Sequence, residues 1–334
     1  MKKIVVYLNR EFPFYSITLQ TELLVQRIEE IFGVKVEYIN NSSLSQHINT
    51  DNEIILWPID SFKFELVRLS SLNNVVFIYH NITPAKYFWK SEPLVALRSI
   101  MGRLQLIALK FTNAKWVAVS KYNAEELSTL GVKLVEYCPN LLSGSISHME
   151  KTEVSSLLFN GRIVQNKGCL ELLNVVKDVA GKLRRPLQLY LVGSGKENSI
   201  YYKKFSKSLE NLEKDSSLEI HWFQRVTPQQ LADLYSKCWL YITMSKHEGF
   251  GLPACESIAN GTPAVYIKCG GQESVLNSIG LCAASSISDT IVSLLSNEAE
   301  LKELYRLQYQ VVENYIIPNA DVVIKNVYSK FLGK

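Results

Sequence analysis

The segment of the chain with the most residues able to do chemistry runs from Lys246 to Glu256, with the sequence KHEGFGLPACE. Its two glycines, Gly249 and Gly251, let the backbone turn tightly and bring N–H groups close to a ligand. The proline that follows is typical of a helix start, and a helix N-terminus attracts anions. Glu248 in the loop and Glu256 in the first turn of that helix would face the same ligand.

These residue types indicate a ligand that carries both phosphates and hydroxyl groups. Carboxylates repel phosphate, so Glu248 and Glu256 suit hydroxyls, whereas the helix start suits phosphates. A nucleotide sugar has both kinds of group. The alternative is an ordinary strand-to-helix turn whose acidic residues stabilise the helix.

A second group of residues with possible chemistry is Asn160–Gly168, with the sequence NGRIVQNKG. Arg162 and Lys167 flank a loop that follows an apolar run. Arg supplies a forked donor and Lys a compact charge, so the two could bind one diphosphate. They could also be ordinary solvated surface cations.

The elements that must position these residues are predicted by short apolar runs that alternate with helical patterns, as in parallel sheets built from βαβ units. Helices are predicted over 18–31, 170–183 and 227–237, the last opened by a capping box of Thr227 and Gln230. Strands are predicted over 3–8, 34–39, 53–57, 75–79, 115–119 and 134–137, and again over 156–159, 187–192, 218–222, 240–243 and 263–267.

The length of 334 residues predicts two domains rather than one. The stretch 139–152 is rich in Ser and lacks periodicity, as expected of a linker. We therefore expect one domain over 1–145, a second over 152–310, and a helical segment over 311–334 that packs back toward the first. Two doubly wound domains in tandem would bring the carboxyl ends of both sheets to a shared cleft.

The second half of the chain resembles the retaining glycosyltransferases of family 4. These enzymes have the GT-B fold, an α/β fold of two doubly wound Rossmann-like domains whose parallel sheets face each other across a cleft. Four segments carry the resemblance in the same order, namely FNGRIVQNKG, LYLVGSG, QRVTPQQLADLY and HEGFGLPACESIANGTPAVYIKCGGQESV, which begin at Phe159, Leu189, Gln224 and His247.

The resemblance implies roles for the residues that match the family's motifs. Glu248 would contact hydroxyls of the transferred sugar, and Glu256 would bind the ribose. Val226 would contact the base through its backbone. Arg162, Lys167 and the backbone amides of Gly249, Phe250 and Gly251 would bind the donor diphosphate.

In the first half, the segment Tyr79–Pro84 (YHNITP) resembles the family's active-site histidine segment. His80 would then contact the donor sugar as a second catalytic residue, although a capping or loop histidine is the plainer interpretation. The departure is at Asn9–Phe14, which stands where the family has a glycine-rich loop beside the phosphates. By the resemblance, the first domain lies on the acceptor side and the second binds the nucleotide sugar.

The resemblance implies a retaining hexosyltransferase that takes a hexose from a UDP- or GDP-sugar to a glycan or lipid-linked glycan acceptor. Its family often serves bacterial surface polysaccharide and lipopolysaccharide biosynthesis. The chain has no Asp-x-Asp motif, so we expect no metal in the reaction, and no cofactor is implied. Two alternatives are a nucleotide-sugar epimerase of the same architecture and a non-catalytic GT-B subunit.

Composition and charge limit the partners. A net charge of +4 is too small to predict nucleic-acid binding, and the six cysteines form no C-x-x-C pair. No apolar run is long enough to span a membrane, so we expect the protein in the cytoplasm. Residues 86–121 hold seven Lys or Arg and one Glu among aromatic residues. That stretch suits a peripheral place on the anionic inner face of the membrane, or a buried core helix with basic flanks.

Overall fold

The protein is described by a computed structural model over residues 2–8, 16–40, 43–48, 50–68, 72–142, 151–317 and 319–333. The Asn9–Phe14 loop and most of the linker, residues 143–150, lie outside these ranges. The chain divides into two compact units. One comprises Met1–Ala85, Leu94–Leu141 and Ile317–Lys334, and the other Lys86–Pro93 and Leu142–Ile316.

The first unit is built on a six-stranded parallel sheet with the strand order β2-β1-β3-β4-β5-β6. Its strands are β1 (Lys3–Tyr7), β2 (Val36–Ile39), β3 (Glu53–Ile59), β4 (Val75–Tyr79), β5 (Lys115–Ala118) and β6 (Val135–Tyr137). Its helices are α1 (Ser16–Phe32), α2 (Leu44–His47), α3 (Pro93–Leu109), α4 (Lys121–Thr129) and α12 (Asp321–Leu332), with the short 3-10 turn η1 (Phe64–Arg68). A second 3-10 turn, η2 (Ala85–Tyr87), begins at the last residue of the segment Met1–Ala85, and its Lys86 and Tyr87 belong to the second unit.

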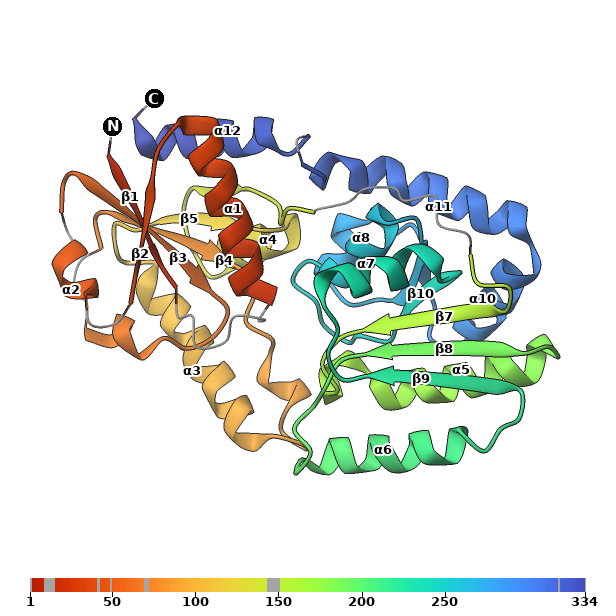
Figure 1. Ribbon diagram of the computed structural model, residues 1–334. Coiled ribbons are helices and arrows are strands. Elements are labelled where there is room, and N and C mark those ends of the chain that lie inside the picture. The colour runs from red at the N-terminus through yellow and green to blue at the C-terminus, as the bar shows by residue number, and fades with distance from the viewer. Residues whose placement is uncertain are drawn as a thin grey trace. The chain divides into compact units, whose positions relative to one another are not determined.

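The core of the first unit follows from the alternation of side chains along buried strands. Val5, Ile55 and Phe77 point to one face, where they pack in one cluster with Leu106 and Leu109 of α3. Figure 1 shows α1 in front of this sheet. Helix α12 packs against α1, where Arg27 Nε donates to Asp321 Oδ1 over 3.0 Å, so the chain end returns to the first unit.

The second unit repeats the plan with a six-stranded parallel sheet in the order β12-β11-β10-β7-β8-β9. Its strands are β7 (Ser155–Asn160), β8 (Leu187–Val192), β9 (Leu218–Phe223), β10 (Leu240–Thr243), β11 (Ala264–Ile267) and β12 (Leu281–Cys282). Its helices are α5 (Cys169–Leu183), α6 (Ile200–Leu212), α7 (Pro228–Lys237), α8 (Leu252–Ala259), α9 (Gly271–Val275), α10 (Ile287–Ser296) and α11 (Glu298–Val312), with the 3-10 turns η3 (Gln165–Lys167) and η4 (Glu313–Tyr315).

Helices cover the sheet of the second unit on both faces (Figure 1). One face is filled by α5, α6 and α10, whose apolar stripes include Val176, Phe205 and Ile291. On the other side, α8 packs against both α7 and α11. The predicted capping box at α7 is present, since Thr227 Oγ1 accepts from Gln230 N and the Gln230 side chain accepts from Thr227 N.

Two parallel-sheet, Rossmann-like units were predicted from the alternating pattern, and both are present. Among the described residues, no helix is both long and apolar enough to cross a lipid bilayer.

Candidate functional site

Two loops of the second unit meet because their strands are neighbours. β7 pairs with β10, and in a parallel sheet both chains leave the sheet at the same edge. The loop after β7 holds Arg162 and Lys167, and the loop after β10 holds Glu248. A backbone hydrogen bond of 2.8 Å from Lys246 N to Asn166 O joins the two loops directly.

A second contact between these loops is an ion pair of two predicted site residues. Lys167 Nζ lies 2.6 Å from Glu248 Oε1, and the two side chains are only 16% and 14% exposed. The backbone of Glu248 is held on both sides, because its N–H donates to Cys269 O and its carbonyl accepts from Gly271 N, each over 2.8 Å. A charge-assisted bond in a half-buried place fixes both side chains at the sheet edge.

Gly168 is the residue that allows this approach. It has a φ of +65°, and a Cβ atom on it would lie 2.1 Å from Met244 O, on the chain just after β10. Only glycine adopts that conformation at low cost and leaves room for the neighbouring backbone. Lys167 therefore reaches Glu248 because the next residue has no side chain.

The backbone beyond Glu248 offers hydrogen-bond donors. Gly251 precedes α8 with a φ of +85°, and a Cβ there would meet the Gln272 side chain at 2.5 Å. The side chain of Phe250 is buried against the ring of Tyr315, with ring centroids 5.7 Å apart. Within the described ranges, the N–H groups of Phe250 and Gly251 meet no backbone or side-chain acceptor. Such groups at a helix start suit an anion.

Glu256 belongs to a buried polar chain that links α8, α7 and the end of β7. Tyr235 Oη donates to Glu256 Oε2 over 3.1 Å, and Asn160 Nδ2 donates to Tyr235 Oη over 2.8 Å. Part of Glu256 is exposed, but the protein around its carboxyl raises its pKa to about 7, with burial as the cause and Tyr235 opposing it. At neutral pH this carboxyl is divided between its two protonation states.

The position of Glu256 corrects one prediction. It is the fifth residue of α8, so it lies in the second helical turn and not in the first. The cause is that α8 begins at Leu252, directly after the positive-φ cap at Gly251. Glu256 is therefore oriented by Tyr235 and not by the free N–H groups of the helix start.

The other predicted donor residues lie at the same edge of the sheet. Arg162 is exposed, two residues after β7, and Val226 is partly buried in the loop between β9 and α7. His247 is buried, with the ring of Tyr87 at a centroid distance of 5.7 Å. Arg162 thus faces solvent, whereas Lys167 is engaged with Glu248.

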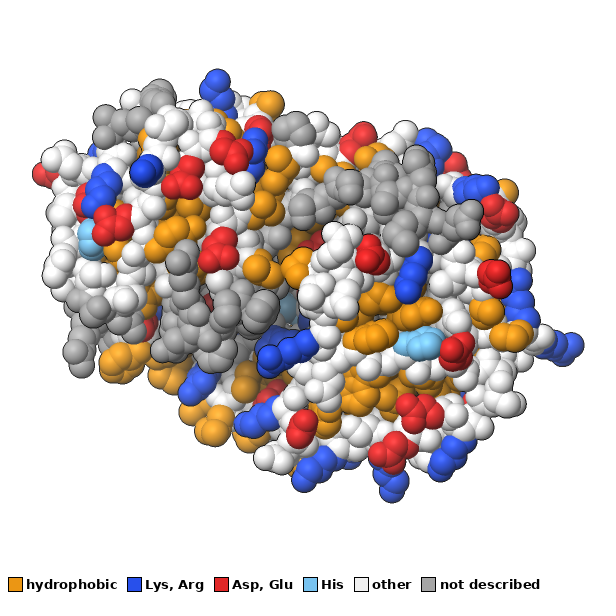
Figure 2. All heavy atoms as spheres, in the orientation of Figure 1, with side chains coloured by type: hydrophobic (Ala, Val, Ile, Leu, Met, Phe, Trp, Pro, Cys, Tyr) orange, Lys and Arg blue, Asp and Glu red, His pale blue; other side chains and the backbone are white. Residues whose placement is uncertain are grey.

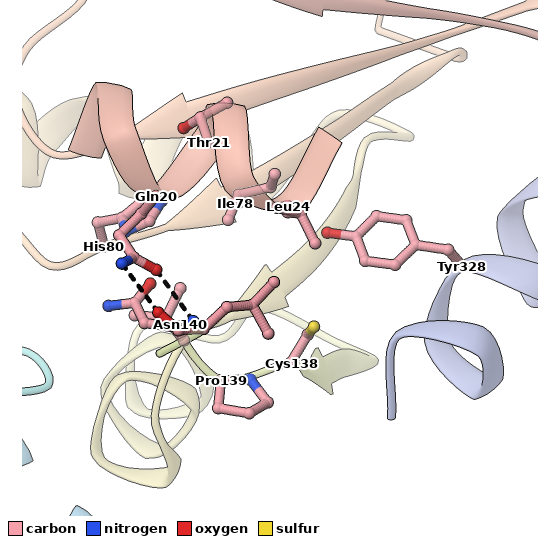
Figure 3. Close-up of a pocket in the computed structure, with 11 residues that line it drawn as sticks. Gln20, Thr21, Leu24, Ile78, His80, Cys138, Pro139, Asn140 and Tyr328 are labelled. Carbon is pink, nitrogen blue, oxygen red and sulfur yellow. Dashed lines mark hydrogen bonds between the residues drawn. The ribbon is translucent and has the colours of Figure 1, made fainter. Parts of the chain in front are cut away.

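His80 lies in the first unit, directly after β4. Its N–H donates to Ile59 O over 2.9 Å, and its ring lines a small pocket with Gln20, Asn140 and Tyr328 (Figure 3). The dashed bonds of Figure 3 join the Gln20 amide to the backbone of Leu141 over 3.0 and 2.9 Å.

The electrostatic surroundings of His80 keep its ring neutral. Burial lowers its pKa to about 4, Asp60 opposes this shift and Lys63 adds to it. Its Nε2 atom is buried without a hydrogen-bond partner among the described residues. A neutral imidazole can accept or donate a hydrogen bond, according to its tautomer.

The sequence of the second unit is similar to that of known proteins. Residues 147–310 match the sequence model of the family described as glycosyl transferases group 1. This part of the chain, just under half of its length, is therefore similar to the glycosyl transferases of group 1. An uncharacterized glycosyltransferase of Methanocaldococcus jannaschii is 28% identical over 221 residues, which are 64% of this chain and 59% of that protein. The chain thus matches less than two thirds of the length of this curated relative.

Solved structures show likeness over the full chain. The sucrose-phosphate synthase of Thermosynechococcus elongatus has a TM-score of 0.76 at 15% identity and covers 100% of both chains. The Anabaena protein HepE, solved in complex with UDP and glucose, has a TM-score of 0.71 at 14% identity, again over 100% of both chains. The fold is therefore GT-B, as predicted.

Two features of this region were not predicted from its sequence. Gly168 ends the NGRIVQNKG motif, and a glycine directly after Lys167 is a signal for close backbone approach. The hydrogen bonds that link Asn160 through Tyr235 to Glu256 could not be predicted from the sequence, because these residues lie on three separate elements.

Proposed function

We propose that the chain is a retaining glycosyltransferase that moves a hexose from a UDP- or GDP-sugar to a glycan or lipid-linked glycan acceptor. In this proposal the second unit binds the nucleotide sugar and the first unit serves the acceptor side. The similarity to the glycosyl transferases of group 1 supports the transfer reaction. The HepE structure, which contains UDP and glucose, supports a nucleotide-sugar donor.

The single observation that carries the proposal is the Lys167–Glu248 pair beside the N–H groups of Phe250 and Gly251, which have no acceptor among the described residues. An ammonium group has three donors, so Lys167 can bind Glu248 and a phosphate oxygen together. Glu248 is then held next to the diphosphate, where the transferred sugar begins, and its other oxygen can accept from a sugar hydroxyl. Arg162 and the N–H groups of Gly249, Phe250 and Gly251 complete the proposed diphosphate contacts.

The remaining assignments place one residue on each other part of the donor. Glu256 would bind the ribose, and a carboxyl with a pKa of about 7 can accept from or donate to a ribose hydroxyl. Val226 would contact the base through its backbone. His80 would contact the transferred sugar, with its neutral ring as a hydrogen-bond partner.

Cleavage of the donor leaves negative charge on the nucleoside diphosphate. Lys167, Arg162 and the N–H groups at the start of α8 would stabilise that charge without a metal. Retention would proceed on one face of the sugar, with the leaving diphosphate oxygen taking the proton of the acceptor hydroxyl. No residue is assigned as a covalent nucleophile, in contrast to retaining glycosidases.

The experiment that tests this proposal incubates the full chain with radiolabelled UDP- and GDP-hexoses, with and without excess chelator. The expected result is release of UDP or GDP at the same rate in chelator, with label passed to a glycan or lipid-linked acceptor. Conversion of the sugar without any acceptor would instead support the epimerase. Nucleotide binding without release would support the non-catalytic subunit.

A second proposal concerns the place of action, on the cytoplasmic face of a membrane during surface polysaccharide or lipopolysaccharide biosynthesis. Helix α3 buries one set of side chains, those of Ala96, Ser99, Gly102, Leu106 and Leu109. Its other face exposes Leu94, Leu97, Met101 and Leu104, which are 76%, 50%, 40% and 60% exposed. Hydrophobic and basic side chains lie together over α3 at the lower left of Figure 2.

The charges around this face favour an anionic lipid surface. Residues 93–124 contain five Lys or Arg and no Asp or Glu. An apolar helix face with cations inserts into the headgroup region of anionic bilayers. We expect salt-sensitive sedimentation with phosphatidylglycerol vesicles, and its loss in Leu104→Glu. Leu134→Glu, at a residue that is 92% exposed outside α3, is the control. Equal binding of both variants would contradict the proposal.

A further inference from the structure

The connection that carries His80 begins at Tyr79, the last residue of β4, and runs to Thr83. We propose that Arg103 and Glu126 are positioning residues that hold this connection and thereby aim His80. The inference rests on the proposed contact of His80 with the donor sugar. It adds two residues that lie outside the motifs of the chain, one on α3 and one on α4.

One carboxylate oxygen holds both sequence neighbours of His80. Tyr79 Oη donates to Glu126 Oε2 over 2.6 Å, and Asn81 Nδ2 donates to the same oxygen over 2.9 Å. Burial raises the pKa of Tyr79 well above its ordinary value, with Glu126 adding to the shift, so this hydroxyl stays a donor. The residues on either side of His80 are thus tied to a single point on α4.

Arg103 fixes that point from α3. Its Nη2 atom lies 2.6 Å from Glu126 Oε1, and its Nη1 donates to Ile82 O over 2.9 Å. Ser99, one turn earlier on α3, donates its hydroxyl to Thr83 O. The guanidinium therefore binds the carboxylate and the connection together, as its planar fork allows.

The backbone of the connection needs such support. Asn81 has a φ of +83°, a left-handed conformation that costs a residue with a side chain about 1 kcal/mol or more. Its amide also donates to Asn123 Oδ1 over 2.9 Å, and Asn123 Nδ2 donates to Tyr79 O over 3.2 Å. Asn123 is fully buried.

His80 has no comparable anchor on its own ring. Its Nε2 lacks a partner among the described residues, and the ring lines the pocket of Figure 3. The direction of its side chain is therefore set by the backbone on each side. An error of about 1 Å in the position of a reacting group lowers turnover about 100-fold, so a fixed connection matters to catalysis.

The test compares Glu126→Gln with Asp321→Asn in the full chain. Asp321 on α12 pairs with Arg27 on α1 of the same unit, and these side chains are 23% and 18% exposed. The side chains of Glu126 and Arg103 are 12% and 29% exposed. Each variant removes one carboxylate charge from a partly buried Arg pair, and Arg27 keeps Glu30 as a second partner. We expect similar melting temperatures, but a kcat about 10- to 100-fold lower in Glu126→Gln alone, with the donor KM little changed.

Two further readouts separate positioning from general damage. Glu126→Gln should cost nothing more in a His80→Gln background, because coupled residues are not additive. The NMR titration midpoint of His80 should move from about 4 toward 6.5 in Glu126→Gln and stay in place in Asp321→Asn. Asp60 and Lys63 face this ring in both variants.

Equal kcat in the two carboxylate variants together with an unchanged His80 titration would overturn the inference. A fully active His80→Gln enzyme would refute a different claim, the role of His80 in the proposed function. The titration of His80 would still decide whether Glu126 holds the connection.

Discussion

The loop after β10 in the second unit and the connection after β4 in the first both leave the carboxyl end of a buried parallel strand. They reach their shapes by different means. The loop after β10 depends on glycines, at Gly168 beside it and Gly251 within it. In the described part of the chain it leaves the N–H groups of Phe250 and Gly251 without an acceptor. The connection after β4 depends on side chains, with Glu126 and Asn123 holding an asparagine at positive φ.

The two regions therefore present different kinds of hydrogen-bonding group to a ligand. A loop made of glycines presents backbone donors, which suit phosphates of many orientations. A connection held by side chains presents one fixed group, here His80. The contrast is consistent with the proposed roles, in which backbone donors of the second unit bind the diphosphate and His80 makes one directed contact.

The largest expected effect is at Glu248. Glu248→Gln removes the charge that pairs with Lys167 and the strongest acceptor for a sugar hydroxyl, so kcat should fall by about 1,000-fold. Glu171→Gln is the control, because Glu171 on α5 pairs with Lys246 of the loop that holds Glu248 but is 41% exposed. Steady-state transfer rates measure both. A similar fall in kcat in the two variants would show that Glu248 matters no more than a neighbouring carboxylate outside the site.

Gly168→Ala tests whether the donor loops depend on missing side chains. The new Cβ would lie 2.1 Å from Met244 O at a φ of +65°, so we expect a loss of roughly 2–4 kcal/mol in the free energy of unfolding and weaker UDP binding. Gly181→Ala is the control, since nothing lies within 4 Å of its Cβ position inside α5. It should be neutral or stabilising by about 1 kcal/mol. Denaturant titration with and without UDP gives both values.

Opposite pH dependences should distinguish the two regions. The pKa of Glu256 is raised from 4.5 to about 7, so its contribution to stability is full below pH 4.5 and is lost as the pH rises through 7. The pKa of His80 is lowered from 6.5 to about 4, so its contribution is full above pH 6.5 and is lost as the pH falls through 4.

Each of these changes should amount to roughly 2 kcal/mol, after allowance for partial exposure of both residues. Glu256→Gln should remove the decline in unfolding free energy between pH 5 and 7.5. His80→Gln should remove the decline between pH 6.5 and 4. Denaturant titrations at these pH values measure both contributions. If the two residues changed the unfolding free energy with pH in the same direction, the environments described for them would be wrong.

The smallest expected effect is at Asn81. Asn81→Gly keeps the left-handed backbone without strain but loses the bonds to Glu126 and Asn123, whereas Asn81→Ala loses the bonds and keeps the strain. The glycine variant should therefore be about 1 kcal/mol more stable than the alanine variant and retain more activity. Thermal melting and transfer rates compare them. A more active alanine variant would show that the backbone conformation is not what aims His80.

Much of the fold could be predicted from sequence because buried parallel strands have a strong apolar signal. β4, β8 and β10 have the predicted bounds, at Val75–Tyr79, Leu187–Val192 and Leu240–Thr243. β12 was not predicted, since Leu281–Cys282 is too short to show any pattern. The capping box at Thr227 was found because its residues are three apart.

The candidate site could be predicted only in part, for a physical reason. Lys167 and Glu248 were both named from their motifs, but their mutual ion pair depends on strand order and on Gly168. Arg103 and Glu126 gave no signal, because they are 23 residues apart on different helices and meet only through packing. The roles assigned to all these residues stay predictions.

The most direct test of the central claim is the melting temperature of the full chain as a function of UDP and GDP concentration, in wild type and in Lys167→Met. A ligand that binds only the folded state stabilises it by about 2.7 kcal/mol at 100 times its Kd. We predict a saturable rise with one nucleotide, strongly reduced in Lys167→Met. No rise with either nucleotide, or the same rise in both proteins, would contradict a diphosphate site at the Lys167–Glu248 pair.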